Sequence, residues 1–232
     1  MTPQHAGMSA IAALEGGGSV IGDLLSPVER HELAACAYVR EYAANGVIFR
    51  EGDAPASMAL LLSGEAKLSK AVPHGRECVL CLIRQGRILD PAAPYYEGGF
   101  PASASAVKRC RVLHLPCREV RLLAETCPAL GLLLVRALSF RQRLFINKTA
   151  ESQGLISVPR RVASWLLHRR NMEKSLSIEL VGTRELLARL LGVSRESLSR
   201  ELNGLARSGI IDLDRHSITI LDEAALRKAA RE

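Results

Sequence analysis

The sequence predicts an α+β protein in which a β-roll is followed by a long helix and then by a small helical module that ends in a β-hairpin. From Gly46 to about Arg118, short apolar runs alternate with glycine-rich turns, as in an antiparallel roll. From Pro128 to about Gln153 the apolar residues recur at helical spacing instead. Since 232 residues exceed the size at which single domains cluster, about 100–150 residues, we expect more than one module.

The composition is that of a folded, moderately basic protein. Apolar residues make up 48% of the chain, and 31 Lys and Arg against 24 Asp and Glu give a net charge of +7. No apolar run reaches the roughly 18 residues of a membrane span, and the N-terminus has no secretory pattern. We therefore expect a cytoplasmic protein with no membrane partner. The six cysteines are spread along the chain, which is typical of free, reduced thiols.

The N-terminal region precedes the roll. The first twenty residues include Gly16-Gly17-Gly18 and predict a loose arm. Ser26-Pro27 then opens a segment, Val28 to Tyr42, whose apolar residues have helical spacing.

The long helix carries a narrow apolar seam, which we call the predicted seam. Its members follow one another at steps of three and four: Leu130, Leu133, Ala137, Phe140 and Leu144. This period is typical of a coiled coil, so we expect the predicted seam to pair two copies of the chain. The alternative is that the seam packs on the protein's own roll. Leu134, Leu138 and Phe145 lie on a second face of the helix. That face would pack on the roll if the predicted seam pairs with a second copy.

A pair of short helices follows the break at Gly154 to Pro159. Thr183 caps the first helix, which stops at Gly192, and Ser194 caps the second. Leu198, Leu202, Leu205 and Ala206 form the inward stripe of the second helix. Its outer face therefore carries these polar residues: Glu196, Ser199, Arg200, Asn203 and Arg207.

Two helices joined by a glycine turn, with a polar outer face on the second, predict a helix-turn-helix that enters the major groove of DNA. Arg donates two hydrogen bonds to guanine and Glu accepts from cytosine, so these residue types suit base reading. The alternative is an ordinary helical hairpin with a solvated face. Two alternating segments after it, Ile210 to Leu213 and Ser217 to Leu221, predict a wing whose tip holds Arg215 and His216 for phosphate contact.

The arrangement resembles the CRP/FNR superfamily of bacterial transcription regulators over about residues 25–225. The strongest motif is Gly192-Val193-Ser194-Arg195-Glu196-Ser197-Leu198-Ser199-Arg200, and the roll matches in turn glycines such as Gly52, Gly64 and Gly86. The resemblance implies a roll like that of cyclic-nucleotide-binding domains, a homodimer, a winged helix-turn-helix on palindromic DNA, and RNA polymerase as a partner. TTGA-type and TGTGA-type half-sites are both compatible with the motif.

The residue patterns, together with the resemblance, divide the chain into four expected parts. They are a flexible arm (1–24), a sensor β-roll (25–127), a dimerisation helix (128–156) and a DNA-binding domain (157–232). The expected DNA-binding residues are Arg195, Glu196, Ser199, Arg200, Thr183, Arg184, Ser194, Ser197, Arg215 and His216. We expect no catalytic residues, no metal ligands and no enzyme activity.

The effector region departs from the family pattern. Cyclic-nucleotide binders that the chain resembles have a short helix with a Glu after the glycine equivalent to Gly86, and then a phosphate-binding Arg. Here Pro91 and Pro94 disfavour that helix, and Pro101 and Ala102 stand where the Arg is expected. The sequence therefore argues against cyclic AMP.

An iron-sulfur cluster is also disfavoured. The FNR branch places several cysteines close together before the roll, whereas only Cys36 lies upstream of residue 78 here. Cys78 and Cys81 form a single CxxC pair, and because residues three apart on a strand point to opposite faces, we do not expect the two thiols to share one metal.

A gas-sensing haem remains as one effector hypothesis. Residues Phe100 to Ala104 are similar to a strand of the dissimilatory nitrate respiration regulators, and that likeness implies a possible haem that binds nitric oxide or carbon monoxide. Its candidate ligands are His74, His114, Cys110 and Cys117. A thiol switch at the last two is another hypothesis.

Two rival functions stay open at this stage. The roll alone is compatible with a metal-dependent enzyme, although His74 and His114 are too few ligands. It is also compatible with a sensor that signals to a protein partner and no longer uses the helix-turn-helix.

Overall fold

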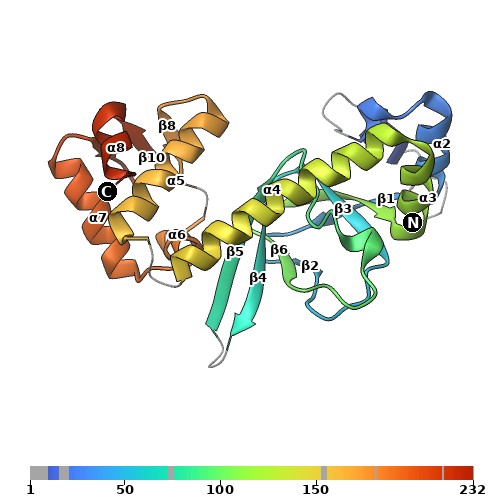
Figure 1. Ribbon diagram of the computed structural model, residues 1–232, viewed down its shortest axis with the longest axis horizontal. Coiled ribbons are helices and arrows are strands. Elements are labelled where there is room, and N and C mark those ends of the chain that lie inside the picture. The colour runs from blue at the N-terminus through green and yellow to red at the C-terminus, as the bar shows by residue number, and fades with distance from the viewer. Residues whose placement is uncertain are drawn as a thin grey trace. The chain divides into compact units, whose positions relative to one another are not determined.

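The computed structural model describes residues 10–15, 21–72, 76–152, 156–180, 182–215 and 217–231. The chain divides into two compact units, residues 1–144 and 145–232. Helix α4 (Pro128–Ser152) crosses this boundary, so it belongs to both units rather than forming a separate part (Figure 1).

The first unit is built on a β-roll of two antiparallel sheets. One sheet has the order β1-β7-β3 and the other β2-β6-β4-β5. The strands are β1 (Tyr38–Tyr42), β2 (Val47–Phe49), β3 (Ser57–Ser63), β4 (Glu65–Val72), β5 (Arg76–Arg84), β6 (Ser103–Ala106) and β7 (Cys110–Pro116). Helical elements flank them: η1 (Gly22–Leu24), α2 (Pro27–Cys36), η3 (Ala93–Tyr95), α3 (Cys117–Thr126) and α4. The predicted α+β class and the β-roll are confirmed.

Helix α2 shows how local sequence determines an element. The Ser26 side chain accepts from the Glu29 backbone N–H at 3.3 Å, and the Glu29 carboxylate accepts from the Ser26 N–H at 2.7 Å. This reciprocal pair satisfies two N–H groups that a helix start leaves open. The helix ends at Cys36, so its predicted extension to Tyr42 is wrong. Residues Tyr38–Tyr42 instead pair with β7, because sheet pairing outweighs helical spacing here.

The N-terminal segment is more ordered than the predicted arm. Residues 10–15 are helical, and Ala10 and Leu14 are buried in a core shared with α2, β3, β7 and α4. Ile21 is buried in the same core. The described part of this segment therefore packs against the roll instead of lying loose.

A β-bulge changes the geometry of the CxxC pair. Cys78 lies opposite Lys70 and Cys81 lies opposite Leu68, and the register shifts between them. Because the two partners are two residues apart on one strand, both cysteines lie on the same face of the sheet. The expectation of opposite faces is wrong. All six cysteines are free thiols, as predicted.

Helix α4 presents the predicted seam to its own chain. Leu130 is only 1% exposed and lies in the core of the first unit, and Leu133 packs against that core. Leu144 packs against the interior of the roll. Leu130 is therefore covered by its own chain, whereas Leu133 and Leu144 are only partly buried, so pairing through the predicted seam stays a prediction. Ala137 is half-buried, and Phe140 is exposed beneath the Arg87 guanidinium.

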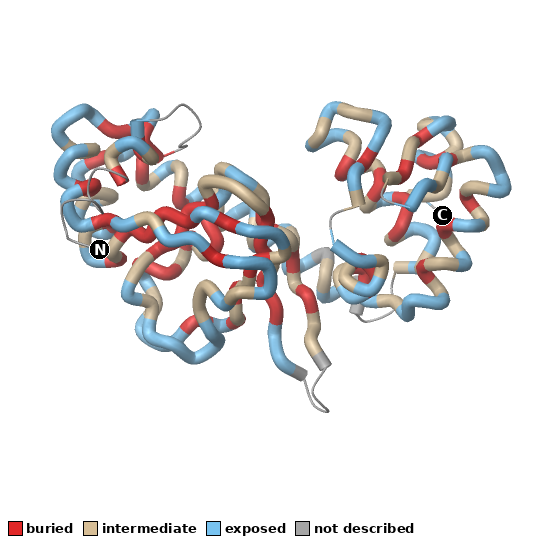
Figure 2. Tube along the Cα trace, turned by 180° about the vertical axis from the view of Figure 1, so that it is seen from behind, coloured by how far each residue is buried: buried red, intermediate tan, exposed pale blue. Residues whose placement is uncertain are grey.

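The second unit is a small winged module. Its elements are α5 (Val158–Glu173), β8 (Ser177–Glu179), α6 (Arg184–Leu191), α7 (Arg195–Arg207), β9 (Ile211–Leu213), β10 (Ser217–Ile220) and α8 (Glu223–Ala229). The three strands form a sheet of order β8-β10-β9. Val162, Leu166, Leu198 and Ile218 lie in one core, and Figure 2 shows buried residues gathered inside each unit. The predicted wing is confirmed by the β9 and β10 pairing.

Within the described ranges, no single helix is both long and apolar enough to cross a membrane. Among the described residues, one pair of consecutive helical segments, α3 and Pro128–Ala150, is long and apolar enough when taken together, and the two segments meet at a bend of 117°.

Candidate nucleic-acid interface

Helix α6 and the turn after it follow the predicted capping. The Thr183 hydroxyl accepts from the Leu186 N–H at 3.2 Å and so caps the start of α6. The helix ends at Gly192, whose φ of 63° lies in the left-handed region that favours glycine. Arg184 is half-buried at the first helical position. Local sequence therefore places the turn where the prediction had it.

Helix α7 begins at a second cap. The Ser194 side chain accepts from the Ser197 N–H at 3.1 Å and lies 3.0 Å from the Ser197 hydroxyl. Leu198, Leu202 and Leu205 are buried in the core of the module. Because these residues follow one side of the helix, the opposite side faces solvent.

The solvent-facing side of α7 has a defined chemistry. Arg195, Glu196 and Arg200 are exposed, and Ser199 is half-buried between them. The Glu196 backbone N–H, and after it the Ser194 side chain, hold the pKa of the Glu196 carboxyl below its usual value. At neutral pH the helix therefore presents an acceptor at Glu196 and, about one turn later, a guanidinium donor at Arg200. Asn203 and Arg207 are exposed further along.

The wing adds one described basic residue. The Asp214 N–H donates to the Ser217 carbonyl at 3.0 Å and closes the hairpin. Arg215 at its tip is exposed. His216, the other predicted wing residue, lies outside the described residues.

Two cations that the sequence analysis missed hold the turn between α6 and α7. Arg161 Nη1 on α5 donates to the carbonyls of Leu191 at 3.4 Å and Gly192 at 3.2 Å. Lys148 Nζ on α4 donates to the Leu190 carbonyl. They lie about 30 and 42 residues from the turn, so no local pattern identifies them.

His114 is enclosed in the roll. Tyr38 stacks on its ring at 4.7 Å between centroids, the Tyr42 hydroxyl lies 2.9 Å from Nε2, and the Ser57 hydroxyl lies 3.0 Å from Nδ1. Both ring nitrogens therefore have protein partners. Burial, and after it the positive charge of Arg40, lowers the pKa of His114 to about 4. The residue is a neutral structural histidine rather than an open haem ligand.

The predicted thiol ligands are also unsuited to haem. The single S–H of Cys110 has the Glu65 and Lys108 carbonyls as acceptors, both 3.2 Å from Sγ, and burial raises the pKa of its thiol. Burial raises the pKa of Cys117 to about 11. Both therefore remain thiols at neutral pH, whereas a haem-ligating or redox-active cysteine needs the thiolate. His74 lies outside the described residues. The described candidates do not fit a haem or a thiol switch.

The region between Gly86 and Ser103 holds several contacts among the protein's own side chains. Only a three-residue 3₁₀ turn, η3, occurs where the cyclic-nucleotide helix was considered. Phe49 and Phe100 stack at 3.9 Å between centroids. Arg141 from α4 reaches into the roll and donates to Leu89 O at 2.8 Å and to Cys81 Sγ at 3.1 Å. No group of three or more His, Cys, Asp or Glu in the described part of the chain is arranged to hold a metal ion.

Comparison with known proteins extends these observations. Residues 39–127 match the model of the cyclic nucleotide-binding domain, and residues 160–229 match the Crp-like helix-turn-helix domain. The chain is 28% identical to the "Cyclic AMP receptor protein" of Thermus thermophilus over 92% of this chain and 97% of that protein. It is 27% identical to the "CRP-like cAMP-activated global transcriptional regulator" of Mycobacterium tuberculosis over 79% and 84%.

A solved structure supports the same fold. FixK2 from Bradyrhizobium japonicum superposes with a TM-score of 0.75 at 17% identity, and covers 83% of this chain and 96% of its own.

Proposed function

Because the chain belongs to the CRP/FNR family of DNA-binding transcription regulators, we propose that it acts as a homodimer on a palindromic site whose bases are read by helix α7. The arrangement of α7 carries this proposal. Its capped start, its buried leucine stripe and its exposed Glu196 and Arg200 leave acceptor and donor groups free for base edges. Half-sites of the TTGA or TGTGA type suit this pair.

The remaining contacts are assigned to the phosphate backbone. Thr183, Ser194 and Ser197 lie at helix starts, where backbone N–H groups also bind phosphate. Arg184, Arg195 and Arg215 supply positive charge around them. His216 belongs to this set by its place in the sequence. By family likeness we propose RNA polymerase as the protein partner.

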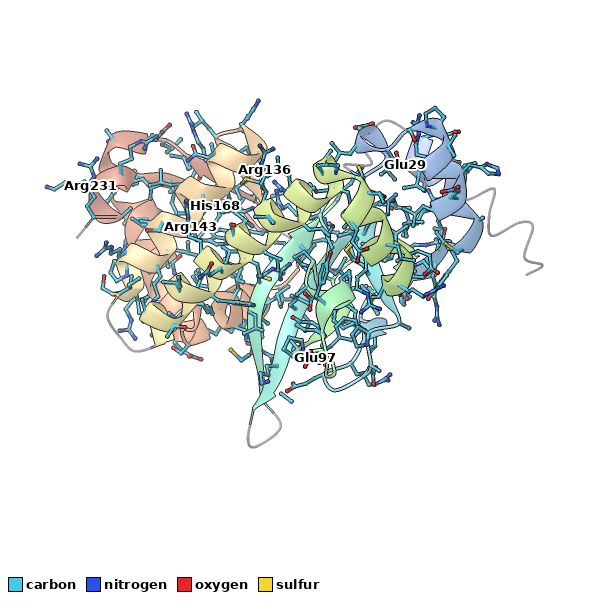
Figure 3. All side chains as sticks on the ribbon, turned by 45° about the vertical axis from the view of Figure 1, so that its right-hand side comes forward. Glu29, Glu97, Arg136, Arg143, His168 and Arg231 are labelled. Carbon is cyan, nitrogen blue, oxygen red and sulfur yellow. The ribbon has the colours of Figure 1, made fainter. Side chains whose placement is uncertain are left out.

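The pairing surface is assigned to the exposed stripe of α4, which consists of Leu132, Val135, Ser139, Gln142 and Ile146. Leu132, Val135 and Ile146 are 50%, 58% and 61% exposed. The steps between members are three and four residues, the period of a coiled coil. Arg136 and Arg143 are exposed beside this stripe, where charged residues commonly flank such a seam (Figure 3). A second copy would bury apolar area that the roll leaves uncovered.

The effector is proposed to differ from cyclic AMP. The names of the two relatives suggest cyclic AMP for those proteins, but Pro101 and Ala102 offer no cation for a phosphate here. Arg141, a cation that reaches the roll from α4, already donates to Leu89 O and Cys81 Sγ.

Selection of DNA from a random-sequence pool, with and without cyclic AMP, tests these proposals together. We expect the wild-type protein to enrich one inverted repeat whose half-site centres lie about 10 base pairs apart, and to enrich it equally in both conditions. Binding should weaken steeply as salt rises, because phosphate contacts release counterions. Failure to enrich any repeat would contradict the DNA-reading role. Enrichment only with cyclic AMP would contradict the effector proposal.

A further inference from the structure

The end of helix α6 leaves carbonyl groups that need partners. The N–H groups of Val193 and Gly192 donate to the carbonyls of Ala188 and Arg189 at 3.0 and 3.2 Å. The next three carbonyls belong to Leu190, Leu191 and Gly192, and an α-helix supplies no internal donor for them. In this chain their donors are two cationic side chains.

Lys148 and Arg161 are those donors. Lys148 Nζ donates to the Leu190 carbonyl, and Arg161 Nη1 donates to those of Leu191 and Gly192. A positive charge at a helix C-terminus also interacts favourably with the helix dipole. A Cβ built at Gly192 would lie 3.6 Å from Arg161 Nη1 and 3.9 Å from Lys148 Nζ, so both cations surround the turn itself.

Arg161 also fixes the start of its own helix. Its Nε donates to the Ile156 carbonyl at 2.8 Å, directly before the cap residue Ser157 of α5. A single guanidinium therefore joins the start of α5 to the turn between α6 and α7. Ser194, the cap of α7, is two residues beyond Gly192. The entry of the recognition helix is thus held by side chains from both α4 and α5.

We propose that Lys148 and Arg161 are positioning residues, which fix the recognition helix relative to the last turns of α4 and so set the distance between the two recognition helices of a dimer. This inference rests on the proposed pairing of α4 and the proposed role of α7. Lys148 provides the direct link, because it lies on α4, the proposed pairing helix, while its amino group contacts the turn between α6 and α7. The contact joins the two elements without passing through the connection between α4 and α5.

The test compares Lys148→Met with Lys148→Arg in the full-length protein. Methionine keeps most of the apolar stem but removes the donor, whereas arginine keeps a cationic donor. Arg160→Met is the matched control, because it removes one exposed positive charge from the start of α5. The probes are the inverted repeat selected by the wild-type protein, the same repeat with its spacer lengthened or shortened by about one or two base pairs, and a duplex with one half-site.

We expect Lys148→Met to bind the selected repeat on the order of tenfold more weakly and to discriminate less between spacers. Its affinity for the single half-site and its melting temperature should match those of the wild type. Lys148→Arg and Arg160→Met should keep the wild-type spacer profile. A wild-type profile for Lys148→Met would overturn the inference, as would an equal loss on the single half-site with a lowered melting temperature. If the wild-type protein itself shows no spacer preference, the proposed function fails instead.

Discussion

Replacing Val135 and Ile146 together by glutamate is expected to convert the dimer into a monomer and to reduce affinity for the selected inverted repeat at least about 100-fold. Both side chains are more than half exposed in the single chain, so the substitutions leave its core intact. In a paired helix they would bury like charges against one another, which costs several kcal/mol per ion. A monomer holds one half-site at a time and loses the advantage of two linked contacts.

Sedimentation and DNA titration measure these two effects. Leu122→Glu is the control, because Leu122 is an exposed leucine on α3 and is not a member of the α4 stripe. It should leave both the oligomeric state and the affinity unchanged. A Val135→Glu, Ile146→Glu protein that remained dimeric would show that another surface pairs the copies.

The first unit is expected to lose stability on acidification because of His114. Its pKa is about 4 in the folded chain, against an ordinary value of 6.5. As the pH falls below 6.5 the unfolded chain binds a proton that the folded chain still rejects. The contribution of the neutral His114 to the free energy of unfolding is therefore fully present above pH 6.5, and it is lost progressively as the pH falls to about 4. The difference in pKa corresponds to about 3 kcal/mol of unfolding free energy.

Two measurements check this expectation. The ring signals of His114 followed by NMR should titrate near pH 4, and a midpoint near 6.5 would contradict the buried, neutral assignment. Denaturant unfolding at pH 7 and near pH 4 should show a smaller loss of stability in His114→Gln than in the wild type. That comparison removes the contribution of the carboxylates, which titrate in the same range.

The helix-turn-helix could be predicted because its determinants are local. Thr183 and Ser194 accept hydrogen bonds from residues three positions later, and Gly192 supplies the left-handed turn between them. Each of these features depends on a few neighbouring residues. The wing follows similarly from alternating residues on either side of a short tip.

The face of α4 that its own chain covers could not be predicted in this way. The helix carries two stripes at steps of three and four residues, and the sequence shows the period without showing which stripe the roll covers. Leu130 and Leu144 pack within their own chain, while Leu132 and Ile146, each two residues further along, stay exposed. The sequence shows the period of the stripes, whereas tertiary packing decides which of them the chain itself covers.

Long-range contacts account for the other differences. The bulge that turns Cys78 and Cys81 to one face depends on their partner strand, and the partners of His114 come from β1 and β3. Lys148 and Arg161 meet the α6 carbonyls across many residues of sequence. None of these contacts has a signature in the local residue pattern.

Base reading by α7 is the central claim, and the sequence preference of Arg200→Ala tests it most directly. The variant and the wild type are titrated with the selected repeat and with repeats substituted at each base pair in turn. Arg231→Ala serves as the control for the loss of one exposed positive charge. We expect Arg200→Ala to lose about 1–3 kcal/mol on the selected repeat and to become indifferent to one base pair in each half-site, while the control keeps the wild-type preference. Unchanged affinity and unchanged preference in Arg200→Ala would contradict the assignment of α7 as the base-reading helix.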